Sequence, residues 1–600
     1  MSDEQRNTVL RFAVIFTMIT LGFVAVLVKI VYVQTVEREE WMKVAERQVP
    51  SNRNIPATRG NILDCNGQLL ASSMPQYYMY MDTRVEALHQ NNGKLFHEHI
   101  DTLSADLARI VGDRSAAEYK ARITQAYHKR EKRLKVCEHR INYLQRRELE
   151  QNPLIRKGKY KSGVLFDDQH RRIKPFGILA SRTIGGIYGE GGSGNSGLEK
   201  GFDEELRGKD GLSSIQRIGG RNESVTIKEA EDGMDVITTI DANLQDVVEN
   251  ALMAKLKERH AQWGCCMLME TQTGYIRAIA NLDRASDGEN YFEAQNHAVQ
   301  RVEPGSTFKT IALVAALDDG KIQIDDTVSI SKKPWVYMRK SKHTDAHPMD
   351  TMLTVRSALA VSSNIALAKL ITRSYEGSAR KFVQRIERMG LCDSLYCEIP
   401  GAEKARIDVP RDTVTLSKMS YGYSVELSPM QIMMFYNAIA NNGRMVRPML
   451  VTEIRNEGET VRSFRTETVR SSICSRSTLE DIRGALHDVV WDNHLGTAAH
   501  TLAWAWKAQS PIVPIAGKTG TAQLIIPGYG YSGRHHRMTF VGYFPEDNPR
   551  YTCICMIEDP QYPYDAGMDC GSTVRVIAEK TMAYTGCYVY KNGEKKLEKK

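Results

Sequence analysis

The sequence has little that would mark a metal centre, a nucleic-acid site or a bundle of membrane spans. None of its 11 cysteines and 15 histidines stands at a spacing typical of zinc ligands, so we predict no metal site. No second apolar run matches the one near the N-terminus, which leaves a single candidate membrane span. The basic stretch 120–161 has few interleaved aromatics and no nucleic-acid-binding motif. We therefore predict no nucleic-acid partner, and interpret this stretch as a solvated helical face attracted to anionic membrane or wall polymer.

Length and composition indicate a globular protein of two or more domains. At 600 residues the chain exceeds what one hydrophobic core supports, and 42% hydrophobic with 25% charged residues is an ordinary balance. The odd number of cysteines points to free thiols, and most stand where a small apolar residue would fit. Adjacent strand residues face opposite ways, so Cys265 and Cys266 cannot pair with each other. We assign no disulfide, although two pairings stay open, Cys392 with Cys397 and Cys570 with Cys587.

The N-terminal apolar run predicts a membrane anchor. It extends from Phe12 to Val28, is interrupted by Lys29 and resumes to Val33, which is long enough to cross a bilayer with Lys29 reaching toward one interface. No Ala-x-Ala-like cleavage site follows, so we expect a retained anchor and not a removed signal peptide. The prediction is a cytoplasmic tail at 1–11, a transmembrane helix at 12–34, and the remainder on the periplasmic or extracytoplasmic side.

One stretch, residues 301–310, has the features of a nucleophile site. The loop Glu303-Pro304-Gly305 leads into a helix that begins near Ser306 and continues through an apolar run. Ser306 and Lys309 are three residues apart and therefore share one helix face. A serine hydroxyl is a weak nucleophile until a base takes its proton, and a neutral lysine one turn away is such a base. A serine at a helix N-terminus also faces free backbone N–H groups.

Two further segments strengthen this weak local signal by their order. Two other Ser-x-x-Lys pairs occur, Ser329 with Lys332 and Ser378 with Lys381, but neither has a Pro-Gly lead-in and an apolar helix behind it. After Ser306 come Ser362-Ser363-Asn364 and then Lys518-Thr519-Gly520-Thr521. Ser-x-x-Lys, Ser-x-Asn and Lys-Thr-Gly in this order resemble the penicillin-interacting serine transferases and hydrolases.

The region before residue 233 resembles the pedestal of class B penicillin-binding proteins. Residues 59–67 read Arg-Gly-Asn-Ile-Leu-Asp-Cys-Asn-Gly, with Cys65 where that box usually has arginine, and residues 175–185 and 197–208 resemble later boxes. Between them, 103–149 is predicted to be a helical, charged insertion in the pedestal head. The charged residues of the last box are expected to form structural, not catalytic, ion pairs: Asp203, Glu204, Glu205 and Arg207.

The pattern of strands and helices after residue 233 predicts an α+β domain. Strands are expected at 236–241, in a hairpin at 266–280 and in another at 539–557, with helices between 306 and 442 and Asp241 capping a helix from Asn243. The resemblance implies the penicillin-binding transpeptidase fold, an antiparallel sheet flanked by helices. The predicted layout is an extended, dimerisation-like pedestal domain at 35–232, a transpeptidase domain at 233–590, and a charged, unstructured tail at 591–600.

The resemblance implies a serine acyl-enzyme mechanism on peptides that end in D-Ala-D-Ala. Ser306 would attack the carbonyl, and Lys309, made neutral by burial and by the charge of Lys518, would be its base. Ser362 would relay a proton to the leaving amine and Asn364 would bond the peptide backbone. Residues 518–521 would form an edge strand in which Gly520 lets substrate approach. Thr519 and Thr521 hydroxyls would hold the terminal carboxylate, and the N–H groups of Ser306 and Thr521 the oxyanion; no metal or organic cofactor is needed.

Within the family, the anchor and pedestal favour class B and the stretch 421–431 resembles the division-specific branch. Expected partners are D-Ala-D-Ala stem peptides, β-lactams, a membrane glycosyltransferase and other division proteins. The elongation-specific branch is the alternative, since its members share every catalytic residue. A D,D-carboxypeptidase or β-lactamase is disfavoured because no deacylating carboxylate motif is present. A non-enzymatic scaffold or β-lactam sensor is disfavoured because it would not need the complete set of five catalytic side chains, Ser306, Lys309, Ser362, Asn364 and Lys518.

Overall fold

The computed structural model describes residues 3–38, 52–189, 192–218, 221–338, 341–395, 397–503, 513–526, 528, 530–586, 589–591 and 594–596. The chain forms two compact units. The first contains Met1–Ala57 and Lys209–Asp232, and the second contains Thr58–Gly208 and Gly233–Lys600. The described cysteines are all free thiols, so Cys392 and Cys397 do not pair, while Cys587 lies outside the described residues.

The first unit consists of one long helix and a small sheet. Helix α1 (Asp3–Thr35) contains an apolar segment, Phe12–Thr35, that is long enough to cross a membrane and has no buried share. The three strands β1 (Asn52–Ile55), β7 (Gly211–Ile218) and β8 (Arg221–Lys228) pair antiparallel in the order β1-β7-β8. The predicted apolar helix is therefore present, and its length fits a single membrane crossing.

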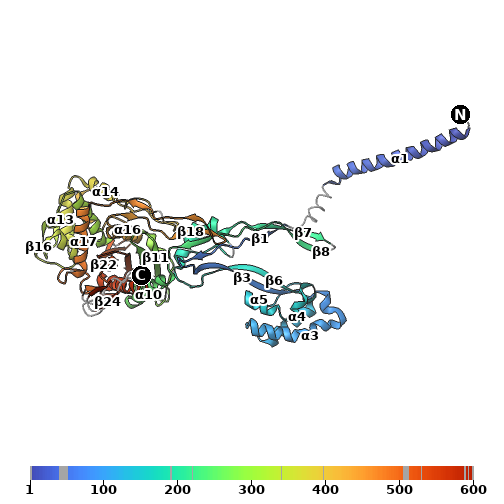
Figure 1. The fold of residues 1–600 in the computed structure, drawn as a ribbon, viewed down its shortest axis with the longest axis horizontal. Coiled ribbons are helices and arrows are strands. Elements are labelled where there is room, and N and C mark those ends of the chain that lie inside the picture. The colour runs from blue at the N-terminus through green and yellow to red at the C-terminus, as the bar shows by residue number, and fades with distance from the viewer. Residues whose placement is uncertain are drawn as a thin grey trace. The chain divides into compact units, whose positions relative to one another are not determined.

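In the second unit, a long strand pair carries a helical lobe (Figure 1). Strand β3 (Leu69–Met81) pairs with β6 (Val164–Ile173) from Ser72↔Ile173 to Met81↔Val164. We call residues 74–171 the head lobe. Its core contains Phe96, Tyr119 and Leu149, all fully buried. The lobe also comprises α3 (Glu86–Ile110), α4 (Ala116–Lys129), β4 (Leu134–Lys135), β5 (Ile141–Asn142), α5 (Tyr143–Leu149), η1 (Ile155–Lys157) and α6 (Lys159–Ser162).

The predicted helical insertion at 103–149 is confirmed in type but not in extent. Its first helix begins earlier, at Glu86, and two short strands interrupt the later part. The sequence missed the early start because Gln90–Gly93 leaves helical geometry, with Asn91, Asn92 and Gly93 at positive φ, and the apolar period breaks there.

One sheet joins the pedestal strands to those that follow residue 233. Strand β9 (Asp235–Thr238) pairs in parallel with β2 (Ile62–Leu63) and antiparallel with β18 (Val451–Asn456). The buried Asp64 carboxylate strengthens this junction by accepting hydrogen bonds from the backbone N–H groups of Asn66, Gln68 and Ala242. Asp241 caps helix α10 (Ala242–Arg259) as predicted, by accepting from the N–H groups at the helix start.

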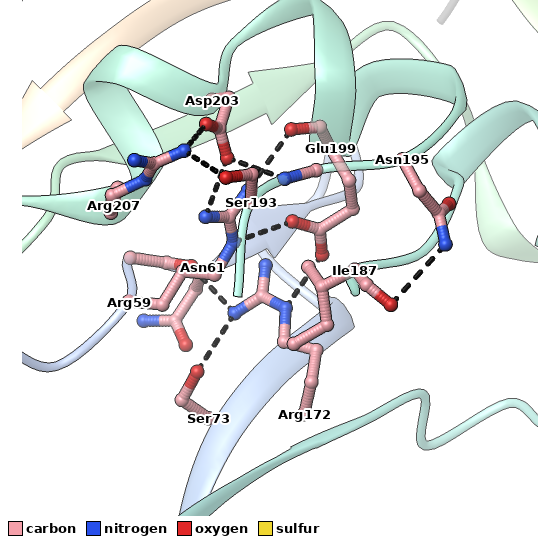
Figure 2. A network of polar contacts seen from close by, with 12 residues as sticks. Arg59, Asn61, Ser73, Arg172, Ile187, Ser193, Asn195, Glu199, Asp203 and Arg207 are labelled. Carbon is pink, nitrogen blue, oxygen red and sulfur yellow. Dashed lines mark hydrogen bonds and ion pairs between the residues drawn. The ribbon is translucent and has the colours of Figure 1, made fainter. Parts of the chain in front are cut away.

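A buried ion-pair network holds the pedestal boxes together (Figure 2). Arg59 and Arg172 both donate to Glu199, which is fully buried, over 2.7 and 2.6 Å. Arg59 also pairs with Asp203 at 2.9 Å, and Arg207 completes the chain by donating to Asp203. Structural ion pairs were predicted at this box, and these confirm the prediction for Asp203 and Arg207. They tie residue 59 to segments more than a hundred positions later in the chain.

Three other positions of the pedestal boxes, two charged and one substituted, behave differently from one another. Glu205 pairs with Arg462 at 3.5 Å, whereas Glu204 is exposed and makes no ion pair with any residue in the described ranges, so the prediction was wrong for Glu204. Cys65 is half-buried, and burial raises the pKa of its thiol to about 11, so the position that usually holds an arginine carries no charge here. The later boxes contain short helices: α7 (Ser181–Ile184), α8 (Gly197–Gly201) and α9 (Asp203–Arg207).

The remainder of the unit is an α+β domain built on a six-stranded antiparallel sheet, as predicted. The strand order is β12-β11-β10-β23-β22-β21. Cys266, Leu268 and Phe540 face a core under α10 and α19, while Met267, Val541 and Met556 face a second core with the central helices. The strands are β10 (Trp263–Glu270), β11 (Ile276–Arg284), β12 (Tyr291–Phe292), β21 (Ala516–Ile526), β22 (Gly530–Phe544) and β23 (Tyr551–Glu558).

Helices fill the middle of the domain, as the sequence predicts, with further short strands among them, and η4 and α19 follow strand β23. The helices are η2 (His297–Val299), η3 (Gly305–Thr307), α11 (Phe308–Asp318), α12 (Val355–Ala360), α13 (Asn364–Tyr375), α14 (Ala379–Arg388), α15 (Thr413–Met419), α16 (Pro429–Ala440), α17 (Arg476–Trp491), the π-helix η4 (Gly567–Gly571) and α19 (Ser572–Tyr584). The remaining strands are β13 (Thr327–Ile330), β14 (Trp335–Tyr337), β15 (Ser341–His343), β16 (Thr351–Thr354), β17 (Met445–Val446), β19 (Glu459–Ser463) and β20 (Thr468–Arg470).

The C-terminal tail differs from the prediction of an unstructured segment. Strands β24 (Val589–Lys591) and β25 (Glu594–Lys596) pair antiparallel. The dipeptide at 592–593 is Asn-Gly, a sequence strongly preferred in two-residue hairpin loops, and the charge of the tail obscured that signal. Residues 597–600 lie outside the described ranges.

Candidate active site

A cleft of about 400 Å³ in the second unit brings the predicted motifs together. Ser306, Ser362, Asn364, Thr519 and Thr521 all line it. The other predicted site residues lie beneath its surface, since Lys309 and Lys518 are fully buried. Segments separated by more than two hundred positions thus meet at one cleft, as the order of the three motifs predicts.

Ser306 lies in a short 3-10 turn, η3, and helix α11 starts only at Phe308. The turn is fixed on both sides. The Thr307 hydroxyl donates to Pro304 O at 2.7 Å, and the Tyr436 hydroxyl donates to Thr307 O at 2.9 Å. Gly305 has φ 54°, and a Cβ there would lie 2.7 Å from Thr521 O. The turn that carries Ser306 therefore packs directly on the strand that carries the third motif, and only glycine permits this approach.

Ser362 links the two buried lysines. It has φ 58°, a left-handed conformation that is uncommon for serine, at the junction between α12 and α13. Lys309 Nζ donates to Ser362 O at 2.5 Å and to its Oγ at 3.1 Å, and Lys518 Nζ donates to the same Oγ at 3.0 Å. The unusual backbone conformation of Ser362 thus aims its hydroxyl between two amines.

The direct contact expected between Ser306 and Lys309 is not formed. The Ser306 hydroxyl makes no hydrogen bond to any residue in the described part of the chain. Lys309 Nζ donates instead to the backbone and side-chain oxygens of Ser362. Helix α11 begins after Ser306, so the spacing of three does not follow one regular helix. In an apo site, catalytic hydrogen bonds are often long and form only with substrate bound.

Burial controls the protonation of both lysines. Desolvation lowers the pKa of Lys309 to about 7, an effect that the nearby Asp345 carboxylate partly opposes. Burial, and then the charge of Lys309, lowers the pKa of Lys518 well below its usual value. We expected the Lys518 charge to help depress the pKa of Lys309, but the structure assigns that shift to desolvation. A lysine that is itself deprotonated offers no charge to its neighbour.

The third motif lies on an edge strand, as predicted, because β21 is the last strand of the six-stranded sheet. Thr519 and Thr521 line the cleft, and the Thr519 hydroxyl shares a 2.6 Å hydrogen bond with that of Thr497. Gly520 does not line it. A Cβ on Gly520 would lie 2.8 Å from Thr307 Cγ2 and 3.3 Å from Thr539 Cβ. Packing beside the nucleophile turn, and not access for substrate, is therefore what requires a glycine here.

Several residues of the cleft were not predicted from the sequence. Asp345 accepts hydrogen bonds from Ser363 Oγ at 2.7 Å and from Ile365 N at 3.0 Å, and it lines the cleft. Asn364 Nδ2 donates to Thr344 O at 2.8 Å, which fixes the amide beside the cleft. Thr497 and Tyr423 also line the cleft. Asp345, Thr344 and Thr497 stand outside recognisable motifs, and only long-range packing brings them to the site. Tyr423 lies in the stretch 421–431, which the sequence related to a branch of the family and not to the cleft. No group of three His, Cys, Asp or Glu side chains within the described residues could hold a metal ion.

Residues 264–582 match the family model described as "Penicillin binding protein transpeptidase domain". The chain belongs to the class B penicillin-binding proteins. Residues 54–238 match a second model, the penicillin-binding protein dimerisation domain, which is the pedestal of this class. This membership makes the chain a peptidoglycan D,D-transpeptidase of the serine type, with β-lactams as ligands.

Named relatives cover nearly the whole chain. It is 27% identical over 576 residues to the probable peptidoglycan D,D-transpeptidase PbpC of Pseudomonas aeruginosa, covering 93% of this chain and 92% of that protein. It is 24% identical to PenA of Neisseria meningitidis, covering 94% and 91%. The penicillin-binding protein 2X structure from Streptococcus thermophilus matches with a TM-score of 0.74 at 20% identity, covering 89% of this chain and 81% of that one, which confirms the fold.

Proposed function

We propose that Ser306 is the acyl-accepting nucleophile of this transpeptidase. The observation that carries the proposal is the chain of hydrogen bonds from Lys309 through Ser362 Oγ to Lys518, which ends beside the cleft that Ser306 lines. Ser306 Oγ attacks the carbonyl carbon of the D-Ala-D-Ala peptide bond, and its proton passes to the neutral amine of Lys309. The C–N bond breaks and D-alanine leaves.

The proton that D-alanine needs comes through Ser362. Its hydroxyl donates to the leaving amine and is reprotonated from one of the two lysines that contact it. An amine of a neighbouring stem peptide then attacks the Ser306 ester, releases the serine and completes the cross-link. Asn364 bonds the donor peptide backbone, and Thr519 and Thr521 hold its terminal carboxylate. The backbone N–H groups of Ser306 and Thr521 serve as the oxyanion hole, a term worth about 3 kcal/mol per donor.

Four segments of the chain have separate roles in this proposal. Residues 1–11 are a cytoplasmic tail and 12–34 a single membrane anchor. Residues 35–232 form the pedestal and 233–590 the catalytic domain, both on the extracytoplasmic side. A reporter fused after Lys600 should be active only outside the cytoplasm, and cytoplasmic activity would overturn this orientation.

We assign the enzyme to septal wall synthesis, with a membrane glycosyltransferase and other division proteins as partners. Two observations support this. The stretch 421–431 resembles the division-specific branch, and the relatives include the peptidoglycan D,D-transpeptidase FtsI of Buchnera aphidicola, which is 26% identical over 66% of this chain and 67% of that protein. Depletion should give filaments in which wall synthesis continues along the sides. Round, swollen cells would instead place the protein in the elongation machinery.

A further inference from the structure

One stretch of the head lobe carries a larger net positive charge than the whole chain. The 42 residues from Lys120 to Lys161 contain 14 Lys or Arg and four Asp or Glu, an excess of ten, against +8 for all 600 residues. The rest of the chain is therefore slightly acidic. A concentrated charge of one sign attracts oppositely charged polymers over a distance of about 8 Å in physiological salt.

The sheet of the lobe brings two basic turns to the same end. The first basic turn is 129–133, which begins at the end of α4, and the second is 156–161, where the chain passes from η1 into α6. Thr83 N donates to Glu131 O, in the first turn, at 3.0 Å, and Asp82 N donates to Gly163 O, after the second, at 2.8 Å. Consecutive residues at the end of β3 thus hold both turns. Strands lie about 4.8 Å apart, so the turns flank β3 within roughly 10–15 Å of each other.

The cations of these turns are available to a ligand. Several are exposed and form no ion pair with another described residue: Lys129, Lys132, Lys157, Lys159 and Lys161. Other cations of the lobe are occupied. Lys120 pairs with Asp101, and Arg133 pairs with Asp167 at 2.9 Å. Ion pairs therefore take up part of the lobe's positive charge and leave these five lysines in water.

Between the turns, one face of the sheet presents aromatic rings with cations above them. Tyr78 and Tyr80 alternate with Tyr77, Met79 and Met81, which face the lobe's core. Arg133 lies 4.3 Å above the Tyr80 ring and Lys135 lies 4.4 Å above the Tyr78 ring. Leu165, which pairs with Tyr80 across the sheet, is 43% exposed. Since cations cover these rings and Arg133 is paired with Asp167, the face offers a ligand the Lys135 ammonium group and the exposed apolar surface of Leu165.

We propose that the two basic turns and this aromatic face bind an uncross-linked glycan strand through the carboxylates of its stem peptides. The inference rests on the proposed function, because each D-Ala-D-Ala stem ends in a carboxylate and a strand of such stems is a polyanion. Strand β3 is 13 residues long and joins the lobe to the sheet beside the catalytic domain (Figure 1). It spans about 44 Å, so only a polymer can occupy lobe and cleft together.

Binding at two places on one polymer raises the local concentration of stem peptides at the cleft without changing the cleft itself. The lobe therefore acts on the availability of substrate, and the chemistry at Ser306 is unaffected by it. This separation lets one experiment distinguish failure of the lobe proposal from failure of the proposed function.

The test is pelleting of the full chain, kept in detergent micelles, with purified wall sacculi that have been stripped of other attached polymers. The variant is Lys157→Glu/Lys159→Glu/Lys161→Glu. The matched control reverses three exposed lysines of the catalytic domain, Lys321→Glu/Lys332→Glu/Lys333→Glu. The lobe variant should need about tenfold more sacculi for half-maximal pelleting, and the control variant should pellet like the parent. When the carboxylates of the sacculi have been converted to amides, the parent chain should likewise need about tenfold more sacculi for half-maximal pelleting.

Penicillin acylation is the second readout on the same samples. The lobe variant should be acylated at the parent rate, and the parent already acylated at Ser306 should still pellet. Equal pelleting of variant and parent would overturn the proposal. The proposal would also be overturned if the variant still pelleted with sacculi but no longer bound nanodiscs that contain anionic lipid. The partner of the lobe would then be a bilayer. Loss of acylation in the parent would instead overturn the proposed function.

Discussion

Lys309 and Lys518 donate to the same oxygen atom, Ser362 Oγ, over 3.1 and 3.0 Å. Both amines are fully buried, and two ammonium groups on either side of one hydroxyl would repel each other without solvent to screen them. The pair therefore favours a state in which one or both lysines are neutral at physiological pH. Such a state supplies both a base for the serine and a route for the proton.

The rate of acylation should rise with pH through about 7. Burial lowers the pKa of Lys309 to about 7, and only the neutral amine accepts the Ser306 proton. At one unit below that pKa about a tenth of the enzyme is competent, so the acylation rate at pH 6 should be about tenfold below its plateau. Stopped-flow measurement of penicillin acylation between pH 5 and 9 gives this profile. A label whose own signal does not depend on pH reports, as a control, whether the protein stays folded.

The variant Lys518→Met separates burial from charge as the cause of that low pKa. Methionine keeps the site apolar and removes the amine. If desolvation sets the pKa of Lys309, the inflection of the acylation rate against pH should stay near pH 7. The plateau rate should fall, because the Ser362 hydroxyl loses a hydrogen-bond donor. An inflection that moves toward 10.4, the value of an isolated lysine, would show that the charge of Lys518 was responsible. Lys309→Arg should be nearly inactive, since a guanidinium does not release its proton in this range.

Gly520→Ala should slow acylation without abolishing the fold. The added methyl would lie 2.8 Å from Thr307 Cγ2, and relieving that overlap moves the turn that carries Ser306. Overpacking of this kind costs about 1–3 kcal/mol, and a displaced nucleophile loses up to about 100-fold in rate. The double variant Gly520→Ala/Thr307→Ser removes Cγ2 but keeps the hydroxyl that bonds Pro304, so it should recover most of the rate. No recovery would mean that Gly520 acts on the substrate.

Glu303 joins the segment that leads into Ser306 to two other segments of the catalytic domain. Its Oε1 accepts hydrogen bonds from Ser424 N at 3.0 Å and from the Tyr531 hydroxyl at 2.8 Å, and burial raises the pKa of its carboxyl. Glu303→Ala should raise the penicillin concentration for half-maximal acylation about tenfold, equivalent to roughly 1.4 kcal/mol for the lost charge-assisted bonds. Glu303→Gln keeps the accepting oxygen and should be close to the parent. Equal losses in both variants would show that the charge matters and the bonds do not.

Neutralising Glu199 should loosen the pedestal locally. Glu199→Gln leaves the nearly buried Arg172 with an uncompensated charge, while Arg59 keeps its pair with Asp203, at a cost of about 3–5 kcal/mol. Hydrogen exchange read by mass spectrometry should become faster in peptides from β3 and β6, while the six-stranded sheet stays protected. Glu231→Gln, which removes an exposed pair with Lys209, is the control and should leave exchange unchanged in β3 and β6. Identical exchange in the Glu199 variant and the parent would contradict the role of this network.

The motifs were predictable because each is short and local. Ser306, Ser362 and Lys518 each sit in a segment whose residue types and spacing are recognisable, and their order in the chain identifies the fold that brings them together. The same holds for the capping of α10 by Asp241, which depends on one turn of helix. Hairpins at both ends of the catalytic domain follow from alternating apolar residues around Gly or Pro turns.

What the sequence did not predict depends on contacts between distant segments. Asp345 reaches the second motif only because β15 and α13 pack together, and no local pattern marks it. The reason for glycine at position 520 is a methyl group on Thr307, more than two hundred residues earlier. The positive φ of Ser362 and the bonds to its hydroxyl from both lysines likewise appear only when the three segments meet.

The measurement that tests the account most directly is mass spectrometry of the full chain after reaction with penicillin. We predict one covalent adduct, located on the peptide that contains Ser306, and its complete loss in Ser306→Ala. The other serines that precede a lysine by three positions, Ser329 and Ser378, should remain unmodified. An adduct on either of them, or an adduct that persists in Ser306→Ala, would contradict the assignment of the nucleophile and the mechanism built on it.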